Sequence, residues 1–321
     1  MAVSNGSSVE ILFIHQQMYY VVLNEGPITK LVVAMLMSLF FVYVNSVMFY
    51  ALRSKRFFKD MPRYILFAHM LLNDSIQLVS TSMLYCLSMI SFQLFRPACG
   101  IMVLVSSTAF RNTPLILAVM SLERYVAICF PLRHAEIVTH KRTFLSIPII
   151  WCICSANIIV DLIYGVLMDS NFVKSQVFCT RERLFIKPWQ LDLFYGTDIV
   201  LFVSVTLVIV FTYIRIMATA RSVSSSKESA KKAYRTVLLH LIQLCLCLTT
   251  FLYNIIERAA AMMGNSILFM DVRYVAFLFI LVLPRCLSPL VYGLRDEALR
   301  PFFIYYFHCG KGKIKPAVNV Q

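Results

Sequence analysis

The sequence contains few charged residues, few glycines and few prolines. Charged side chains make up only 14% of the 321 residues, whereas 60% of the residues are hydrophobic. A soluble protein of this size needs far more polar surface to cover its core. The 9 glycines and 11 prolines are also too few for a low-complexity or disordered chain. We therefore expect an integral membrane protein with one helical domain.

Several chemical signatures are also missing. We find no glycine-rich nucleotide loop, no catalytic triad motif and no cysteine–histidine cluster with metal-site spacing. We therefore expect no enzyme activity, no cofactor and no metal site. The net charge of +14 comes from basic residues that flank apolar runs, which indicates membrane topology and not a nucleic-acid partner.

Seven apolar runs are long enough to cross a bilayer as helices, which takes about 20 residues each. They are Ile28–Leu52, Tyr64–Ile90, Ala98–Ile128, Phe144–Leu167, Leu191–Met217, Thr236–Ile256 and Val272–Gly293. The predicted fold class is an all-α membrane protein, a seven-transmembrane helix bundle. We expect three regions, namely an N-terminal segment 1–27, the bundle 28–293, and a segment 294–321 with a short amphipathic helix and a tail.

The distribution of Lys and Arg between the short loops predicts the orientation. Nineteen of them fall on the side that holds the C-terminus and seven on the other side. Because basic loops stay in the cytoplasm, the N-terminus is expected outside a plasma membrane and the C-terminus inside. Asn5-Gly6-Ser7 is then a glycosylation sequon in the correct compartment, with Asn5 as the acceptor.

Two segments on the cytoplasmic side carry further expectations. Arg221–Lys232 is a polar linker, either a solvated loop or a basic contact for anionic lipid or a protein partner. Leu299, Phe302, Phe303, Tyr306 and Phe307 recur at helical spacing and predict a helix along the membrane surface. Cys309 follows it, as a palmitoylation site or as a bare thiol.

Ten cysteines predict one disulfide. Six lie inside spans and two face the reducing cytosol, so only Cys99 and Cys179 face the oxidising side. A bridge between them would hold the loop after the fourth span over the bundle.

The pair Glu123–Arg124 ends the third span. Arg124 follows Cys99 by 25 residues, roughly 37 Å of helix, so it lies at the inner boundary of the membrane and not at its centre. Glu123 can pair with it. The plain alternative is an interfacial arginine that reaches water.

SLERYVAICFPLRH, at the end of the third predicted span, is one of four stretches that carry a family signature. It resembles the motif that closes the third helix of rhodopsin-like G-protein-coupled receptors, and its continuation resembles DRYVAICxPLxY of odorant receptors, those of fish in particular. KKAYRTVLLHLIQ resembles the KAxxTCxxH entry to helix six, and PRCLSPLVYGLRDEALR resembles PxLNPxIYxLRN in helix seven. FKDMPRYILFAHMLLND resembles the first inner loop and the second helix. The motifs occur in order over nearly the whole chain, although Ser288 replaces the usual Asn.

The resemblance implies a receptor for a small-molecule odorant that activates a heterotrimeric G protein, one that raises cyclic AMP, from within membrane lipid. Ligand would bias a two-state bundle and open an inner cleft for a Gα C-terminus. The residues matched to this switch are Glu123, Arg124, Tyr125, Tyr213, His240 and Tyr292. The residues of the expected polar core are Asn45, Asp74, Arg285 and Ser288, and the family register places Arg285 facing Asp74, where its guanidinium could replace a bound sodium ion.

Arg111 lies 13 residues before Arg124, roughly 20 Å toward the outside, at the depth where such receptors hold ligand. It could pair with Asp198 or Asp161, or bind an anionic group of an odorant such as a carboxylate, and the two roles can coexist. The full set of ligand-binding candidates is Ser106, Ser107, Phe110, Arg111, Asp198, Phe251, Asn254, Tyr274 and Leu278.

Two rival functions stay open. A non-olfactory chemosensory or orphan receptor would share every motif above. A membrane transporter is compatible with buried Arg and Asp, but the hydrophobic pattern shows no internal duplication.

Overall fold

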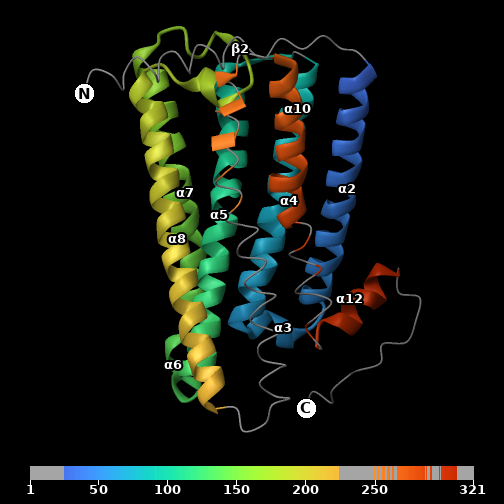
Figure 1. Ribbon diagram of the computed structural model, residues 1–321, viewed down its shortest axis with the longest axis vertical. Helices are drawn as coiled ribbons and strands as arrows, with labels where there is room; N and C mark the ends of the chain where they lie inside the picture. Colours follow the sequence, from blue (N-terminus) through green and yellow to red (C-terminus); the bar gives the residue numbers. More distant parts are fainter. Residues whose placement is uncertain are drawn as a thin grey trace.

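The computed structural model describes residues 25–90, 92–223, 266–285 and 300–308, together with isolated positions between 249 and 299. Its long helices are α2 (Glu25–Arg53), α4 (Pro62–Met89), α5 (Arg96–Cys129), α7 (His140–Met168) and α8 (Pro188–Val223). They run side by side as a bundle, joined by α10 (Ser266–Ala276) (Figure 1). The predicted helical bundle is confirmed.

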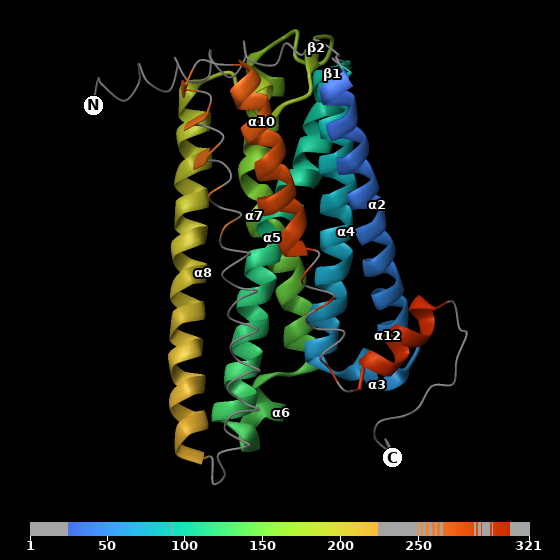
Figure 2. The same ribbon diagram turned by 45° about the vertical axis from the view of Figure 1, so that its right-hand side comes forward.

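Short elements mark the two ends of the bundle. The strands β1 (Gln93–Phe95) and β2 (Gln176–Phe178) lie at one end, which we call the sheet end, with the 3₁₀ turn η2 (Arg181–Leu184) following β2. At the opposite end, the α12 end, lie α3 (Arg56–Asp60), the turn η1 (Pro131–Arg133), α6 (His134–Ile137) and α12 (Arg300–Phe307) (Figure 2).

The helices extend past the predicted apolar runs, because helix formation does not stop where apolar residues stop. Helix α8 continues six residues beyond Met217, through a stretch with good helix formers such as Ala and Arg. Helix α4 begins at Pro62, whose fixed φ suits the first turn, and the Thr139 hydroxyl caps α7 by accepting the Arg142 N–H at 3.3 Å.

The last predicted span differs most from the expected helix. It begins at Ser266, six residues before Val272, and α10 leads into a π-helical stretch, η3 (Phe277–Val282). Such stretches are rare and are frequently found at functional sites. The sixth predicted span, Thr236–Ile256, lies almost wholly outside the described residues.

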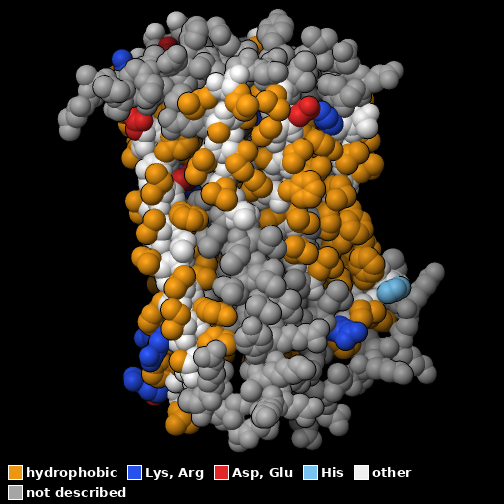
Figure 3. Space-filling model, in the orientation of Figure 1, with side chains coloured by type: hydrophobic (Ala, Val, Ile, Leu, Met, Phe, Trp, Pro, Cys, Tyr) orange, Lys and Arg blue, Asp and Glu red, His pale blue; other side chains and the backbone are white. Residues whose placement is uncertain are grey.

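The outward faces of the helices are apolar. Four described helices, α2, α5, α7 and α8, are long and apolar enough to cross a membrane. Figure 3 shows hydrophobic side chains over much of the described part of one face of the bundle, with Lys and Arg side chains toward its two ends. Helix α4 falls short of the hydropathy of the other four because its inward face carries His69, Asn73, Asp74 and Gln77.

Helix α5 is the most enclosed of these helices. Of its most apolar stretch, 61% is buried inside the protein, against 28% in α8 and 22% in α7. It packs against α4, α7 and α8. A polar side chain on α5 therefore meets protein on several sides and not lipid.

The sheet end is held by a disulfide. Cys99 at the start of α5 bonds to Cys179 just after β2, with their Cα atoms 5.3 Å apart, and both side chains are buried. Strand β2 pairs antiparallel with β1, with Leu94 opposite Val177. The predicted disulfide is confirmed, while the small sheet was not predicted because each strand has only three residues.

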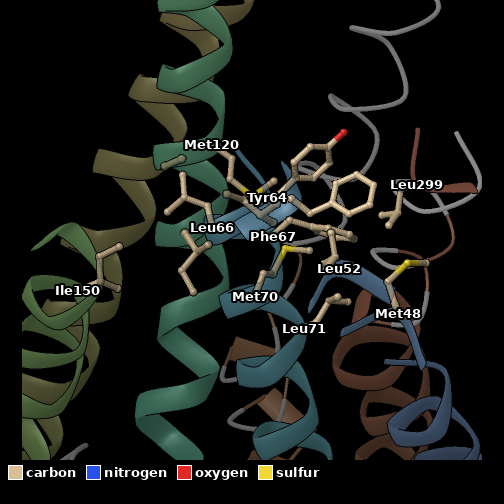
Figure 4. Close-up of a cluster of buried hydrophobic side chains, with 14 of the residues drawn as sticks. Met48, Leu52, Tyr64, Leu66, Phe67, Met70, Leu71, Met120, Ile150 and Leu299 are labelled. Carbon is tan, nitrogen blue, oxygen red and sulfur yellow. The ribbon is translucent and has the colours of Figure 1, made fainter. Parts of the chain in front are cut away.

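The α12 end holds the largest apolar cluster. Met48, Leu52, Tyr64, Phe67, Met70 and Leu71 of α2 and α4 meet Met120 of α5 and Leu299 (Figure 4). Phe303 of α12 is buried in the same cluster, and the Tyr306 ring packs edge-on against Tyr50 at 5.0 Å. The predicted amphipathic helix is present, and its apolar side packs against the bundle.

Candidate functional site

A buried ion pair joins α5 to α8 in the half of the bundle nearer the sheet end. The Nε and Nη2 atoms of Arg111 both lie 2.7 Å from Asp198 Oδ1, and the Arg111 side chain is 1% exposed. The Arg111 guanidinium carbon also lies 5.0 Å from the centre of the Phe194 ring, a cation–π contact. Of the two partners predicted for Arg111, the structure places Asp198 in contact.

The other candidate partner, Asp161, is engaged elsewhere. The Gln190 amide donates to Asp161 Oδ1 at 3.0 Å, and Gln190 Oε1 accepts the backbone N–H groups of Ile186 and Lys187 at 2.7 and 2.9 Å. Gln190 therefore fastens the start of α8 to α7 and orders the segment that follows η2.

The other ligand-binding candidates fall into two groups. Ser106 is buried and Ser107 half-buried on α5, in the half of the bundle nearer the sheet end. Phe110, Tyr274 and Leu278 instead pack against an apolar cluster that includes Tyr85 and Phe277, whose rings stack at 5.4 Å. Phe251 and Asn254 lie outside the described residues.

A second buried pair lies deeper, between α4 and the last span. Thr113 Oγ1 donates to Asp74 Oδ1 at 2.7 Å, and Arg285 Nε lies 3.7 Å from the same oxygen. Arg285 Nη1 donates to the Leu281 carbonyl of the π-helical stretch at 2.7 Å, and its guanidinium carbon lies 5.8 Å from the Phe110 ring centre. The structure thus brings Arg285 and Asp74 together, as the register predicted.

Amides surround this pair. Asn73 Nδ2 donates to the Ala109 carbonyl and to Thr113 Oγ1, both at 2.9 Å, while Asn112 Nδ2 donates to Asn73 Oδ1 at 3.1 Å. Asn45 on α2 is fully buried, and its amide has no hydrogen-bond partner within the described part of the chain. Ser288 lies outside the described residues.

The third polar group lies at the α12 end of α5. Glu123 is almost buried, with Oε1 3.3 Å from His134 Nε2 and Oε2 3.9 Å from Arg124 Nε. Arg124 is more exposed, and a small pocket lies beside it. Its lining residues are Arg63, Tyr64, Phe67, Met120, Glu123, Arg124, Asp296 and Leu299.

Asp296 closes the far side of this pocket. Its carboxylate accepts the Tyr64 hydroxyl at 3.0 Å and Arg63 Nη2 at 3.0 Å, and its Oδ1 accepts the backbone N–H of Ala298 at 3.0 Å. The carboxylate therefore ties the start of the α12 region to α4.

The remaining switch candidates are placed less centrally. The Tyr125 ring packs edge-on against Phe130 and Phe211 at 5.7 and 5.5 Å, so it faces α8 and not the pocket. Tyr213 is half-buried on α8, and no contact joins it to Arg124 among the described residues. His240, Tyr292 and the sequon residue Asn5 lie outside the described residues.

Several site residues were not predicted. His134 contacts Glu123, and the one available signal was its place eleven residues later in the same quoted motif. Thr113 lies two residues after Arg111 on the enclosed helix. The guanidinium carbon of Arg181 lies 3.5 Å from the centre of the Phe194 ring. Phe194 and Arg181 were missed because a cation–π contact leaves no spacing pattern in a sequence.

Comparison with known proteins gives the family. Residues 29–292 match the model of the 7 transmembrane receptor (rhodopsin family). The chain is 34% identical over 287 residues to "Odorant receptor 131-2" of Danio rerio, covering 87% of this chain and 88% of that protein. It is 28% identical over 282 residues to human "Olfactory receptor 52A1" (82% and 86%) and 27% identical over 215 residues to human "Olfactory receptor 52N5" (61% and 62%).

These matches confirm the prediction of a multi-pass membrane protein. They also show that the protein is a receptor and not an enzyme. The chain belongs to the rhodopsin family of seven-transmembrane G-protein-coupled receptors and, within it, to the odorant receptors.

Proposed function

We propose that this receptor binds a small-molecule odorant in the outer half of its bundle and activates a heterotrimeric G protein that raises cyclic AMP. The observation that supports this most is that one enclosed helix, α5, carries both Arg111 and Arg124, roughly 20 Å apart. In this proposal the sheet end faces outside, segment 1–27 is extracellular, and segment 294–321 lies at the cytoplasmic face of the plasma membrane, in contact with lipid.

The pocket at the α12 end is the proposed docking place for the Gα C-terminus. In the described arrangement the pocket is small and Glu123 lies close to both Arg124 and His134. Ligand would favour a second arrangement in which the pocket widens and Arg124 is released. Tyr125, Tyr213, His240 and Tyr292 are further proposed members of this switch.

The charge of the loops supports the orientation. Arg53, Arg56, Lys59, Arg63 and Arg133 lie at the α12 end. Removal of a glycan at Asn5 tests it directly. Asn5→Gln should abolish the mobility shift that a glycosidase produces on the wild-type protein, and an accessible N-terminal tag should stain intact cells. Staining only after permeabilisation would contradict the orientation.

A cyclic AMP assay in transfected cells, across odorant classes, tests the function. Arg124→Ala should abolish the response while the protein still reaches the surface. Arg133→Ala is the matched control, because Arg133 is 71% exposed and pairs only with neighbouring Glu136 among the described residues. A full response in Arg124→Ala cells would refute the switch. Solute flux without any G protein would instead favour a transporter.

A non-olfactory chemosensory role remains the second candidate. It shares the same geometry, and expression of the transcript outside sensory tissue alone would favour it.

A further inference from the structure

Arg111 keeps unused hydrogen-bond donors in a buried place. A guanidinium has five N–H groups arranged as a planar fork. Two of its nitrogens, Nε and Nη2, converge on the single oxygen Oδ1 of Asp198. Only Nε makes a hydrogen bond to this oxygen. The third nitrogen, Nη1, is fully buried and, like Nη2, has no hydrogen-bond partner within the part of the chain that the structure describes. A fork–fork ion pair would instead place two nitrogens against two oxygens.

Burying the Nη1 group of Arg111 costs free energy unless a hydrogen-bond acceptor binds it. Buried polar atoms in native proteins nearly always have a partner, and leaving a charged donor without one carries a desolvation penalty. An exception in a native structure therefore points to an absent ligand, ion or water. The free edge of Arg111 is shaped to accept a planar anion with two oxygens, since this is the geometry that arginine recognises best.

A second guanidinium lies close by. The Arg181 guanidinium carbon is 3.5 Å from the centre of the Phe194 ring, and that of Arg111 is 5.0 Å from the same centre. The two carbons are therefore within 8.5 Å of each other, the sum of these distances. Arg181 follows Cys179 by two residues, so the disulfide to Cys99 on α5 holds it near Arg111. The charge of Arg181 adds to the attraction for an anion here.

From these contacts we propose that the receptor's ligand carries a carboxylate, which binds the free Nη1 edge of Arg111 beside the Phe194 ring. The inference rests on the proposed function, because it names the ligand class of that same site. The ligand's carboxylate competes with Asp198 for one guanidinium, so binding loosens the contact between α5 and α8.

The test uses purified full-length receptor and ligand-dependent shifts in its thermal unfolding midpoint, since a ligand that binds the folded state stabilises it. The probes are acetate, hexanoate, 4-methylpentanoate, benzoate and leucine, each beside its primary amide. At least one carboxylate should raise the midpoint saturably while its amide does not. The proposal is overturned if no carboxylate in the set exceeds its amide.

Two variants test whether the carboxylate binds to Arg111. Arg111→Gln combined with Asp198→Asn replaces the ion pair by a neutral hydrogen-bonding pair, so neither residue is left as a buried charge. This variant should bind the carboxylate at least about tenfold more weakly, since a charge-assisted hydrogen bond is lost. Asp198→Asn alone should bind as well as the wild type or better, because it removes the competing charge.

The matched control is a second Arg–Asp ion pair, whose arginine also lies on α5. Arg96→Gln combined with Asp169→Asn removes the 2.6 Å ion pair at the sheet end and should leave carboxylate affinity unchanged. Equal affinities in the wild type and in the Arg111 double variant would also overturn the proposal. Binding of leucine without binding of 4-methylpentanoate would support it and add an ammonium requirement.

Failure of this inference can be told from failure of the proposed function. Nucleotide exchange on the G protein is measured separately with the same probes. Carboxylate binding without exchange contradicts the proposed function and leaves the carboxylate site standing. Exchange driven only by uncharged odorants, with no carboxylate binding, removes the carboxylate site and leaves the receptor function intact.

Discussion

The pair of Asp74 and Arg285 should destabilise the receptor when either side is removed alone, and much less when both are removed. Their side chains are 0% and 1% exposed, so neither charge can reach water in place. Removing one member of a buried ion pair typically costs about 3–5 kcal/mol, whereas replacing both by apolar groups is often close to neutral. We expect Asp74→Leu and Arg285→Met to lie in the first range, and the double variant well below their sum.

The two single variants should also differ. A carboxyl group can take up a proton when its partner is lost, but a guanidinium does not lose one. Arg285→Met leaves Asp74 with the Thr113 hydroxyl at 2.7 Å, whereas Asp74→Leu removes the carboxylate that lies 3.7 Å from a buried cation. Asp74→Leu should therefore be the more damaging change.

The assay is reversible unfolding of the purified receptor in mixed micelles, followed by circular dichroism. The double-mutant cycle isolates the coupling between the two residues. Strictly additive losses would refute the reasoning. A sodium titration gives an independent readout, because Arg285 already supplies positive charge 3.7 Å from Asp74. Exchange of sodium for a bulky organic cation should leave the wild-type stability unchanged, and a strong sodium dependence would show that the guanidinium does not fill this role.

Two further predictions concern packing and the disulfide. Gly165→Ala should destabilise the bundle by about 1–3 kcal/mol in the same unfolding assay, because the new Cβ would overlap the buried ring of Phe172. Gly196→Ala is the control, with open space at its Cβ, and should be neutral or stabilising by about 0.5–1 kcal/mol; equal effects of the two would contradict the packing argument. Cys99→Ser, Cys179→Ser and the double variant should each lose the same stability, about 2–5 kcal/mol, since all three remove one bond across 80 residues. The same unfolding assay measures the loss of stability, and a double variant less stable than either single one would indicate a second role for one thiol.

Much of the fold was predictable because the lipid bilayer restricts which structures can cross it. A bilayer requires helices of about 20 apolar residues, and the apolar runs from Ile28 to Met217 give five helices in the described residues. The ends of the helices were less predictable, since α8 continues to Val223, beyond the last apolar residue of the predicted span. The sheet joins β1 to β2, two segments far apart in the sequence, and the π-helical stretch depends on local backbone hydrogen bonds; no residue pattern predicts either feature.

The site was predictable where charge is scarce. Arg111, Asp74 and Arg285 could be singled out because an ionisable group inside a membrane span needs a partner or a function. Which partner it finds depends on helix rotation, and this is why Asp198 and Asp161 could not be separated from the sequence. In the structure Asp198 contacts Arg111, whereas Asp161 accepts a hydrogen bond from Gln190. His134 was missed because it lies between two predicted spans, in the short helix α6, where the sequence shows no apolar periodicity.

Three polar groups in the described part of the bundle share one helix, and this limits how a signal can pass. Arg111 reaches α8, Thr113 reaches the Asp74–Arg285 pair of α4 and the last span, and Glu123 reaches α6. Helix α5 can bear these groups because it is more enclosed than α2, α7 and α8, the other described helices that are long and apolar enough to cross a membrane. A ligand that competes for Arg111 therefore acts first on the α5–α8 contact. The effect can reach Arg124 only by a shift of α5 against its neighbours, since a helix is stiff along its axis while its side-chain contacts have alternatives.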